Sequence, residues 1–430
     1  MDGSSQKSVL VIEGGHRLSG RVAVKGSKNA SLAILSGVLA CKGPVFLRGL
    51  PNVSDIRIKL GLMEQFGAKV EFFDEGVSID CSELHAADID PEIARKIRTS
   101  FNMLGPLMAR LGSVKLPQPG GCPIGTRPVD FHIKGLSALG GKIDLRHGIY
   151  HAKGPKLQGC EIYLDFPSAG ATQHIMATAA LAEGATVIQN AAIEPEVVSL
   201  ADFLNRMGAK VEGAGSSTIT IRGVEELKGG EFNVPADRLQ AGTYLIAAAA
   251  TGGDITVEGV LPEYQSPVTS KLKEMGADVE QGPDWICVKS GEYLAATTVK
   301  TMPYPGFPTD MQQPMAALLT MANGVSIVEE TIYENRTQHV PELRRMGAII
   351  HQDGRTCVIT GVARLDGAVV LAPDLRGGAA LVVAGLAARG ETVVKGVEWI
   401  DRGYEDFEDT LNSLGANIQR VPAEEWESAS

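Results

Sequence analysis

The sequence predicts an α/β protein that repeats one supersecondary unit of about seventy residues six times. Three observations carry this prediction: a recurring glycine phrase, a second glycine phrase in step with it, and runs of small apolar residues before the second phrase. The composition of the 430 residues is ordinary for a globular protein, with 44% hydrophobic and 21% charged residues. The sequence therefore predicts a globular protein in which repeated units pack around apolar cores.

The first phrase is an apolar residue, a glycine, a small residue and a strand-like run. It reads FGAKVEF from Phe66 and MGAKVEG from Met207, and four further copies follow the same pattern. The glycines lie 68 to 73 residues apart, at Gly67, Gly140, Gly208, Gly276, Gly347 and Gly415. Since glycine commonly ends a helix, each phrase predicts a helix end followed by a strand.

The second phrase is a glycine followed by a β-branched or alternating run, such as ATVIQNA after Gly184. Before it lies a helix of small apolar residues, for example NASLAILSGVLA over residues 29–40. Such helices are apolar on all sides, which indicates burial. After the strand comes an amphipathic helix, for example residues 55–66. The predicted unit is therefore strand, buried helix, strand, amphipathic helix, strand.

One such unit cannot bury its own apolar helix, so several units must pack around shared helices. A solenoid is one solution, and closed groups of three units are the other. We expect closed groups, which give two domains of three repeats each. The repeat register places the boundary near the polar stretch LKGGEFNVPADR, residues 227–238, after the third copy.

The starts of the buried helices carry polar and charged residues. Helix N-termini bind anions through their dipole and unpaired N–H groups. Lys28, Arg98 and Arg376 oppose the dipole at these ends, and this mismatch favours anion binding. Ser, Thr and Asp at such ends equally fit ordinary N-caps. The other residues at the starts of the six buried helices are Asn29, Thr99, Ser100, Ser168, Gly170, Asp237, Arg238, Thr309, Asp310 and Asp374.

The largest departure from the repeat is the insertion PQPGGCPIGTRPVDFHI, residues 117–133. It holds Cys122 five residues before Arg127, in a glycine-rich loop, which indicates an exposed and activated thiol. A surface cysteine without a role is the alternative. Arg402 in IDRGYED and Arg336 in TIYENRTQHV also depart from the repeat, and either fits a surface ion pair equally well.

Charge and cysteine spacing exclude several classes of protein. A net charge of -11 argues against a general nucleic-acid binder. The six cysteines lack the spacing of zinc ligands or of a disulfide framework, so neither is indicated. We expect no metal and no cofactor. The N-terminal segment lacks the pattern of a secretory signal, and residues 379–388 reach about half a membrane span. We therefore expect a cytoplasmic protein.

Seven segments together resemble the UDP-N-acetylglucosamine enolpyruvyl transferase family along essentially the whole chain. They are GSKNASLAIL, PGGCPIGTRPVDFHI, SAGAT, FPTDMQ, ENRTQHVPEL, DLRGGAALV and IDRGYED. The resemblance implies a two-domain inside-out α/β barrel with three repeats per domain and an active site in the cleft between the domains. We expect residues 28–234 to form domain 1, which carries the Cys122 loop, and residues 1–27 with 235–430 to form domain 2. We also expect a monomer.

The resemblance implies the first committed step of peptidoglycan synthesis, and through it a role in cell shape and division. The 3′-hydroxyl of UDP-N-acetylglucosamine attacks C2 of phosphoenolpyruvate while C3 gains a proton, and phosphate then leaves. This chemistry requires a base, an acid and cations for a phosphate and a carboxylate. The resemblance makes these two metabolites the expected partners, without nucleic acid or membrane.

The resemblance assigns roles to individual positions. Cys122 matches the proton donor, which forms an adduct with phosphoenolpyruvate and is the target of the epoxide fosfomycin. Asp310 matches the base, and Lys28, Arg127 and Arg402 match cations around phosphoenolpyruvate. Further positions that match substrate-binding residues are Asn29, Arg98, Pro128, Val129, Phe131, Ser168, Ala169, Gly170, Ile332, Arg336, Asp374 and Arg376. Some relatives carry a Lys where this chain has Phe166, so one cation for the uridine diphosphate is missing.

Three other functions compete with this one. Enolpyruvylshikimate-phosphate synthase shares the fold and the phosphoenolpyruvate chemistry, but lacks the loop cysteine. A non-catalytic repeat protein explains the six copies, but not a thiol, a carboxylate and several cations at copy-breaking positions. RNA-end cyclases use related repeats, and the acidic charge argues against them.

Overall fold

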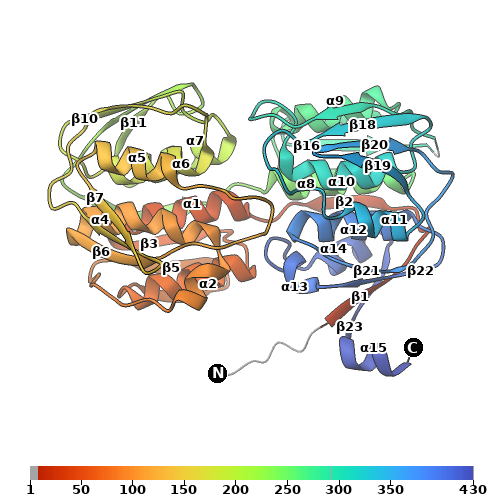
Figure 1. The fold of residues 1–430 in the computed structure, drawn as a ribbon, viewed down its shortest axis with the longest axis horizontal. Helices are drawn as coiled ribbons and strands as arrows, with labels where there is room; N and C mark the ends of the chain where they lie inside the picture. Colours follow the sequence, from red (N-terminus) through yellow and green to blue (C-terminus); the bar gives the residue numbers. More distant parts are fainter. Residues whose placement is uncertain (1–7, 292, 430) are drawn as a thin grey trace. The chain divides into compact units, whose positions relative to one another are not determined.

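The computed structural model describes residues 8–291 and 293–429, and the chain divides into two compact units (Figure 1). Unit 1 consists of Met1–Lys25, Pro123–Thr126 and Ala236–Ser430. Unit 2 consists of Gly26–Cys122 and Arg127–Pro235. Residues 1–7, which the sequence analysis assigns to domain 2, lie outside the described residues.

The described part of unit 2 contains three sheets, each of which is written as a series of neighbouring strands. They are β13 (Leu227–Asn233), β3 (Cys41–Arg48), β5 (Gly76–Asp80) and β4 (Lys69–Phe73); β6 (Ser113–Pro117), β8 (Ile149–Lys153) and β7 (Lys142–Arg146); and β11 (Lys210–Glu212), β12 (Thr218–Arg222), β10 (Ala185–Gln189) and β9 (Glu161–Tyr163). The helices are α1 (Lys28–Val38), α2 (Ser54–Gln65), α3 (Pro91–Lys96), η1 (Arg98–Met103), α4 (Leu104–Leu111), α5 (Asp130–Ala138), α6 (Ala169–Ala179) and α7 (Pro195–Arg206).

Three sheets also make up the described part of unit 1. They are β21 (Val369–Leu371), β22 (Glu391–Lys395), β1 (Ser8–Glu13) and β23 (Asn417–Pro422); β15 (Asp278–Gln281), β16 (Trp285–Lys289), β14 (Asp254–Glu258) and β2 (Ser19–Ala23); and β17 (Thr298–Lys300), β18 (Val325–Glu329), β20 (Thr356–Thr360) and β19 (Ile349–Asp353). The helices are α8 (Arg238–Ala250), η2 (Pro262–Gln265), α9 (Ser266–Glu274), α10 (Thr309–Leu319), α11 (Val340–Arg345), α12 (Leu375–Ala387), α13 (Val397–Ile400), α14 (Phe407–Ser413) and α15 (Ala423–Ala429).

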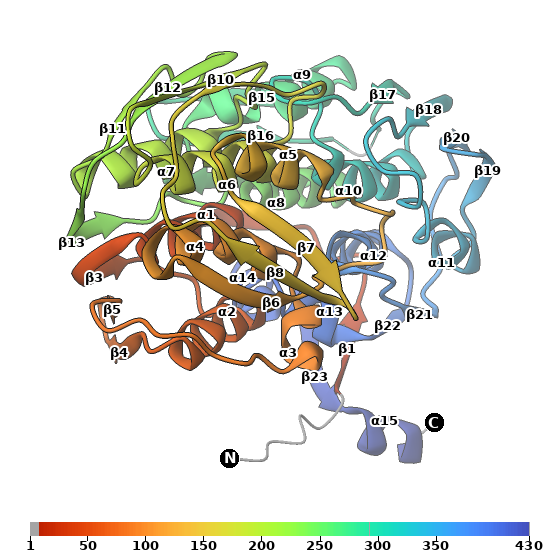
Figure 2. The ribbon, with the colours of Figure 1, turned by 60° about the vertical axis from the view of Figure 1, so that its left-hand side comes forward.

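Within each unit the apolar helices lie inside and the sheets lie outside, as the repeat predicts (Figure 2). In unit 1, helices α8, α10 and α12 contact one another, and in unit 2, helix α6 contacts α1 and α4. These helices are rich in Ala, Gly and other small residues, so their backbones approach closely. The prediction of buried helices shared among repeats is confirmed.

The repeat glycines explain how each amphipathic helix ends. All six adopt left-handed backbone angles, with φ between 94° and 105°. A residue with a Cβ is disfavoured there, so glycine recurs at this position in every copy. In the first five copies the unit is longer than predicted by one strand, because the phrase continues through a turn into a second antiparallel strand, as β11 continues into β12.

Two strands depart from the sequential repeat. Strand β2 precedes α1 along the chain but pairs in parallel with β14 of unit 1. Strand β13 precedes α8 but pairs in parallel with β3 of unit 2. The polar stretch at the expected boundary thus contains a strand of the first copy. Strand β1 lies between β22 and β23, so the N-terminal segment completes a sheet of the sixth copy.

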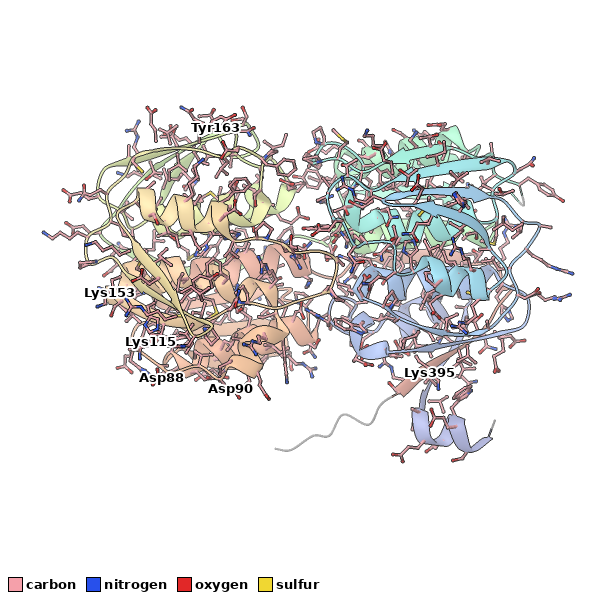
Figure 3. All side chains as sticks on the ribbon, viewed as in Figure 1. Asp88, Asp90, Lys115, Lys153, Tyr163 and Lys395 are labelled. Carbon is pink, nitrogen blue, oxygen red and sulfur yellow. The ribbon has the colours of Figure 1, made fainter. Side chains whose placement is uncertain are left out.

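The sheets carry charged side chains on their exposed faces, such as Lys115, Lys153 and Lys395, and some exposed apolar ones, such as Tyr163 (Figure 3). Lys115 on β6 forms an exposed ion pair with Asp88, at 3.6 Å. Lys395 on β22 connects the sheet to α15, because its Nζ lies 3.0 Å from Glu427 and over the ring of Trp426. Among the described residues, every helix is too short or too polar to cross a membrane.

Candidate active site

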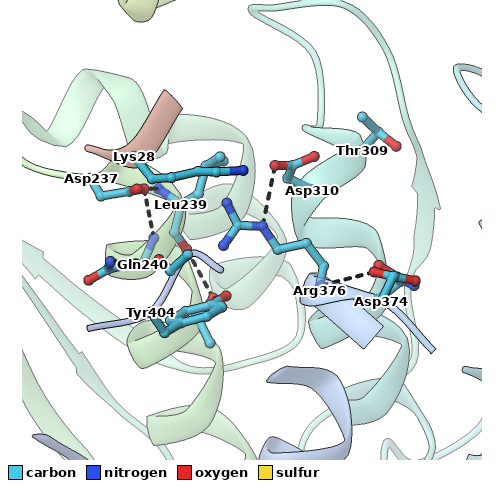
Figure 4. Close-up of polar contacts among 12 residues, drawn as sticks. Lys28, Asp237, Leu239, Gln240, Thr309, Asp310, Asp374, Arg376 and Tyr404 are labelled. Atoms are coloured by element: carbon cyan, nitrogen blue, oxygen red, sulfur yellow. Dashed lines mark hydrogen bonds and ion pairs between the residues drawn. The ribbon is translucent and has the colours of Figure 1, made fainter. Parts of the chain in front are cut away.

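The N-termini of α10 and α12 in unit 1 bring Asp310 and Arg376 together (Figure 4), and Arg336, from the segment between β18 and α11, joins them. Asp310, in the first turn of α10, accepts contacts from Arg336 Nη1 at 2.8 Å and from Arg376 Nε at 3.3 Å. The two arginines are 4% and 1% exposed at their side chains, whereas Asp310 is 25% exposed. We call Asp310, Arg336, Asp374 and Arg376 the Asp310 cluster. It gathers four of the predicted site residues.

Asp374 anchors the second helix of this cluster. Its Oδ1 accepts the backbone N–H groups of Arg376 and Gly377 at 2.9 and 3.0 Å, so Asp374 is the N-cap of α12. Its Oδ2 accepts Nε2 of Gln313 on α10, at 2.9 Å. The capping alternative for Asp374 is therefore correct, and the cap also ties α12 to α10.

The electrostatics of the two arginines follow from their burial beside carboxylates. Burial alone would lower the pKa of Arg336, but Asp310 and Asp374 outweigh it and raise the pKa. Burial alone would likewise lower the pKa of Arg376, but Tyr404, Asp310 and Asp237 outweigh this effect, and the pKa is raised. Both guanidinium groups therefore stay charged.

Several buried polar atoms around the Asp310 cluster have no hydrogen-bond partner within the described residues. They include Arg336 Nε, Arg376 Nη1, Nε2 and Oε1 of Gln312, and both ring nitrogens of His339. Such atoms are rare in native proteins, and each one calls for an explanation such as an ordered water, an ion or a catalytic role. The two arginines therefore make the Asp310 cluster a candidate functional site.

Ile332 lies in a turn that a buried carboxylate shapes. Glu330, at 1% exposure, accepts the backbone N–H groups of Ile332 and Tyr333 at 2.8 and 3.0 Å. It also accepts the hydroxyl of Thr309 at 2.8 Å, and that hydroxyl in turn accepts Arg336 Nη1 at 2.9 Å. Glu330, which the sequence analysis did not select, therefore connects Ile332 to the Asp310 cluster.

Lys28 in unit 2 has a partner that the sequence does not show. Its Nζ lies 3.0 Å from Oδ2 of Asp55, in the first turn of α2, and the two side chains are 13% and 3% exposed. Asp55 offsets the unfavourable placement of a cation at the N-terminus of α1. Ser27 caps this helix by accepting the N–H of Ala30 at 3.2 Å, and Asn29 follows Lys28 in the first turn.

Arg98 and Arg127 lie at the base of the inserted loop. A Cβ added at Gly121 would lie 3.0 Å from Cβ of Arg98 and 3.4 Å from Nη1 of Arg127, so the loop backbone passes close to both. Arg98 begins the 3₁₀ helix η1 and not an α-helix, and the buried helix of this copy, α4, starts only at Leu104. The sequence analysis was wrong on that helix start.

The loop that carries Cys122 is longer than its equivalents. Twelve residues, 118–129, separate β6 from α5, whereas five residues, 49–53, separate β3 from α2. Cys122 is a free thiol of intermediate exposure. The next four residues, Pro123–Thr126, belong to unit 1.

The tip of the loop is held by the segment 334–338 of unit 1. The N–H of Thr126 donates to Glu334 Oε1 at 2.7 Å, and Asn335 Nδ2 and Gln338 Nε2 donate to the carbonyl of Pro123 at 3.0 and 3.3 Å. Gly125 has φ +153°, and a Cβ there would lie 2.6 Å from the Glu334 carboxylate. The Thr126 N–H lowers the pKa of Glu334. We call Glu334, Asn335 and Gln338 the loop latch.

The remaining predicted residues of unit 2 lie at the N-termini of two helices, α5 and α6. Ser168 caps α6 by accepting the N–H of Ala171 at 3.3 Å, and Ala169 and Gly170 form the first turn. Pro128 and Val129 precede α5, and Phe131 is its second residue. Val129, Phe131 and Ala169 are half-buried and pack against the core of unit 2. Phe166 is 45% exposed.

Arg402 lies after α13 in unit 1. Its guanidinium carbon lies 5.2 Å from the ring centroid of Trp399. Tyr404, two residues after Arg402, packs against a different arginine, because the guanidinium carbon of Arg376 lies 5.2 Å from its ring centroid. The described contacts therefore connect the IDRGYED segment to the Asp310 cluster through Tyr404.

Comparison with known proteins adds sequence evidence to this geometry. The family model described as EPSP synthase (3-phosphoshikimate 1-carboxyvinyltransferase) matches residues 12–411. A UDP-N-acetylglucosamine 1-carboxyvinyltransferase 2 from Carboxydothermus hydrogenoformans is 50% identical over 414 residues, covering 96% of this chain and 99% of the relative. A UDP-N-acetylglucosamine 1-carboxyvinyltransferase from Halothermothrix orenii is 49% identical over 412 residues, with the same coverage.

Solved structures show the same fold at lower identity. The enolpyruvyl transferase NikO from Streptomyces tendae superposes with a TM-score of 0.87 at 24% identity, covering 97% of this chain and all of that one. EPSP synthase from Acinetobacter baumannii superposes with a TM-score of 0.74 at 20% identity, covering 96% and 99%. At these identities the likeness concerns the fold alone.

Proposed function

The chain belongs to the UDP-N-acetylglucosamine 1-carboxyvinyltransferases of the EPSP synthase family, and from this membership we propose that it transfers the enolpyruvyl group of phosphoenolpyruvate to UDP-N-acetylglucosamine. The observation that carries the proposal is the identity of about one half along 96% of the chain to relatives of that name. The product is the 3′-enolpyruvyl ether, which commits the nucleotide sugar to peptidoglycan synthesis.

The reaction is an addition followed by an elimination. In the addition, the 3′-hydroxyl oxygen bonds to C2 of phosphoenolpyruvate, the hydroxyl proton goes to a base, and C3 gains a proton from an acid. In the elimination, C3 loses a proton, the bond between C2 and the phosphate oxygen breaks, and phosphate leaves. Two acid–base groups and several fixed cations are therefore needed.

We assign the acid–base roles to Cys122 and Asp310. Cys122 is a free thiol in a loop with glycines on either side of it. It is partly exposed, and a proton donor to carbon must be accessible to the substrate. Asp310 is a partly exposed carboxylate held in one orientation by two buried arginines. A fixed carboxylate of this kind is suited to orient a hydroxyl and accept its proton.

We assign substrate binding to the cations and helix starts described above. Lys28, Arg127 and Arg402 bind the phosphate and carboxylate of phosphoenolpyruvate in this proposal. The nucleotide sugar contacts the two helix starts of unit 2 and the turn at Ile332, while Asn29, Arg98 and the arginines of the Asp310 cluster complete the site. Helix N-termini and arginines favour such anionic groups through dipoles and charge-assisted hydrogen bonds.

Identification of the product tests the proposal directly. Incubation with both substrates should yield one product whose mass equals the sum of the substrates less phosphoric acid, with the new ether at the 3′-oxygen by NMR. Recovery of unchanged UDP-N-acetylglucosamine under conditions in which the protein is folded would refute it. We also propose that the protein is cytoplasmic, because both substrates are charged metabolites. We propose a monomer as well, which sedimentation equilibrium tests.

A further inference from the structure

Two histidines of unit 2 form a pair beside the helix start that carries Ser168–Gly170. Nδ1 of His132, on α5, lies 3.0 Å from Nδ1 of His174, on α6. The backbone N–H of Gly105 donates to Nε2 of His174 at 2.9 Å. Phe101 packs edge-on against both imidazoles, with ring centroids 5.5 and 5.6 Å away. The sequence analysis did not select either histidine.

The one backbone donor fixes the protons of both rings. A peptide N–H can only donate, so Nε2 of His174 must be unprotonated. Burial, helped by His132 and Lys59, lowers the pKa of His174 well below its ordinary value, so this ring is neutral and carries its proton on Nδ1. That Nδ1–H donates to Nδ1 of His132.

His132 is therefore held in one tautomer. Burial, together with Arg98 and Arg127, lowers its pKa to about 3, so the ring is neutral. Since its Nδ1 accepts from His174, its single proton lies on Nε2. Gly105 has a specific part in this arrangement, because a Cβ there would lie 1.9 Å from the hydroxyl of Thr178 and would move the N–H away from His174.

The free edge of His132 points at the start of α6. A Cβ added at Gly170 would lie 3.3 Å from Cε1 and 3.4 Å from Nε2 of His132. His132 is only 9% exposed, and within the described residues its Nε2 takes no hydrogen bond. The Nε2–H of a largely buried ring thus lies beside the first turn of an eleven-residue helix, near enough to Arg98 and Arg127 for their charges to act on it.

We propose that His132 donates a hydrogen bond from Nε2 to a phosphate oxygen of the nucleotide diphosphate, and that His174 is the positioning residue that fixes this tautomer. The inference rests on the proposed function for the identity of the ligand. A helix N-terminus, two arginines and a neutral N–H donor all favour a phosphate group there. Because the donor is neutral, it adds recognition without a further charge beside the arginines.

Histidine NMR of the full chain tests the tautomer. In protein labelled with 15N-histidine, we expect His132 to show an unprotonated Nδ1 and a protonated Nε2, and His174 the reverse. UDP should shift the Nε2–H resonance of His132 and leave exposed His351 on β19 unchanged. An Nδ1–H tautomer at His132, or an unshifted resonance when UDP is bound, would overturn the proposal. A shift with inorganic phosphate or phosphoenolpyruvate but not with UDP would also overturn it, because the contact would then belong to the other substrate.

Two substitutions at one position separate the hydrogen bond from packing. We expect His132→Leu to weaken UDP binding about 10-fold or more, and His132→Gln, whose Nε2 keeps a donor, to restore most of it. His351→Leu is the matched control. The binding constant comes from calorimetry, and the unfolding midpoint of each variant checks its fold. If the unaltered chain does not bind UDP, the proposed function fails; if it does and His132→Leu binds equally well, this inference alone fails.

Discussion

Asp310 illustrates how much of the site depends on single ion pairs. Its carboxylate joins two arginines that are almost completely buried. Removing its charge leaves both guanidinium groups without their shared partner, which is costly in a buried site. The residue therefore contributes to the stability of the cluster as well as to the proposed chemistry.

Asp310→Asn keeps the shape of the side chain and removes its charge. We expect the turnover number to fall about 10²-fold or more, because the base is lost, while UDP-N-acetylglucosamine still binds. Asp366→Asn, at an exposed ion pair with Arg389, is the matched control and should leave turnover unchanged. Turnover within tenfold of the original chain would assign the base to another residue.

Cys122 can be compared with Cys160, because these are the two partly exposed cysteines among the described residues. We expect Cys122→Ser to reduce turnover near neutral pH about 10²-fold or more while nucleotide-sugar binding persists, and Cys160→Ser to have little effect. Fosfomycin should modify Cys122 alone, as measured by peptide mass spectrometry. Unchanged phosphate release by Cys122→Ser, or labelling at Cys160, would contradict the assigned role.

At the scale of elements, the inserted loop depends on the loop latch. The contact between Thr126 and Glu334 requires a glycine at position 125, since any side chain there would meet the carboxylate. Cys122 lies one residue before the latched segment. The latch therefore restricts the conformations available to the thiol.

Glu334→Gln weakens the latch without changing its size. We expect a fall in turnover and in the rate of fosfomycin labelling of about 2- to 10-fold, and a larger fall for Gly125→Ala. Glu329→Gln, at an exposed ion pair with Lys300 on the preceding strand, is the control. Equal turnover and labelling rates for Glu334→Gln, Gly125→Ala and the control would show that the latch has no influence on the thiol.

At the scale of the whole molecule, the exchanged strands determine which parts of the chain fold alone. Strand β1 lies in the middle of a sheet, and its Leu10 and Ile12 are fully buried. Strand β2 completes another sheet of unit 1. Residues 236–430 therefore lack two strands that their own cores require.

A fragment of residues 236–430 should fail to unfold cooperatively and should aggregate, because it exposes unpaired strand edges. Joining residues 1–25 to its C-terminus should restore a cooperative transition, since Ser8 pairs with Pro422 and β1 can then return to its place between β22 and β23. Circular dichroism during heating compares the two. Cooperative unfolding of the shorter fragment at the same temperature would contradict this view.

The periodic part of the fold was predictable, and the long-range pairings were not. Left-handed glycines and apolar helices leave local signals in the sequence, which predict the six repeats. Cys122 is predicted because its loop interrupts one of these repeats. The exchange of β2 and β13, the pairing of Asp55 with Lys28 and the histidine pair join residues distant along the chain. The start of α4 is misplaced at Arg98 in the sequence analysis, because the 3₁₀ helix η1 precedes α4 and a 3₁₀ turn has no distinct period. Periodicity and local composition contain no information on such partners.

Phosphate release from phosphoenolpyruvate, measured with two alternative acceptors, tests the central claim most directly. UDP-N-acetylglucosamine and shikimate-3-phosphate separate the two enolpyruvyl transfers that this fold supports. We expect rapid, stoichiometric release with UDP-N-acetylglucosamine and none above background with shikimate-3-phosphate. Release with shikimate-3-phosphate alone, or with neither acceptor, would contradict the account.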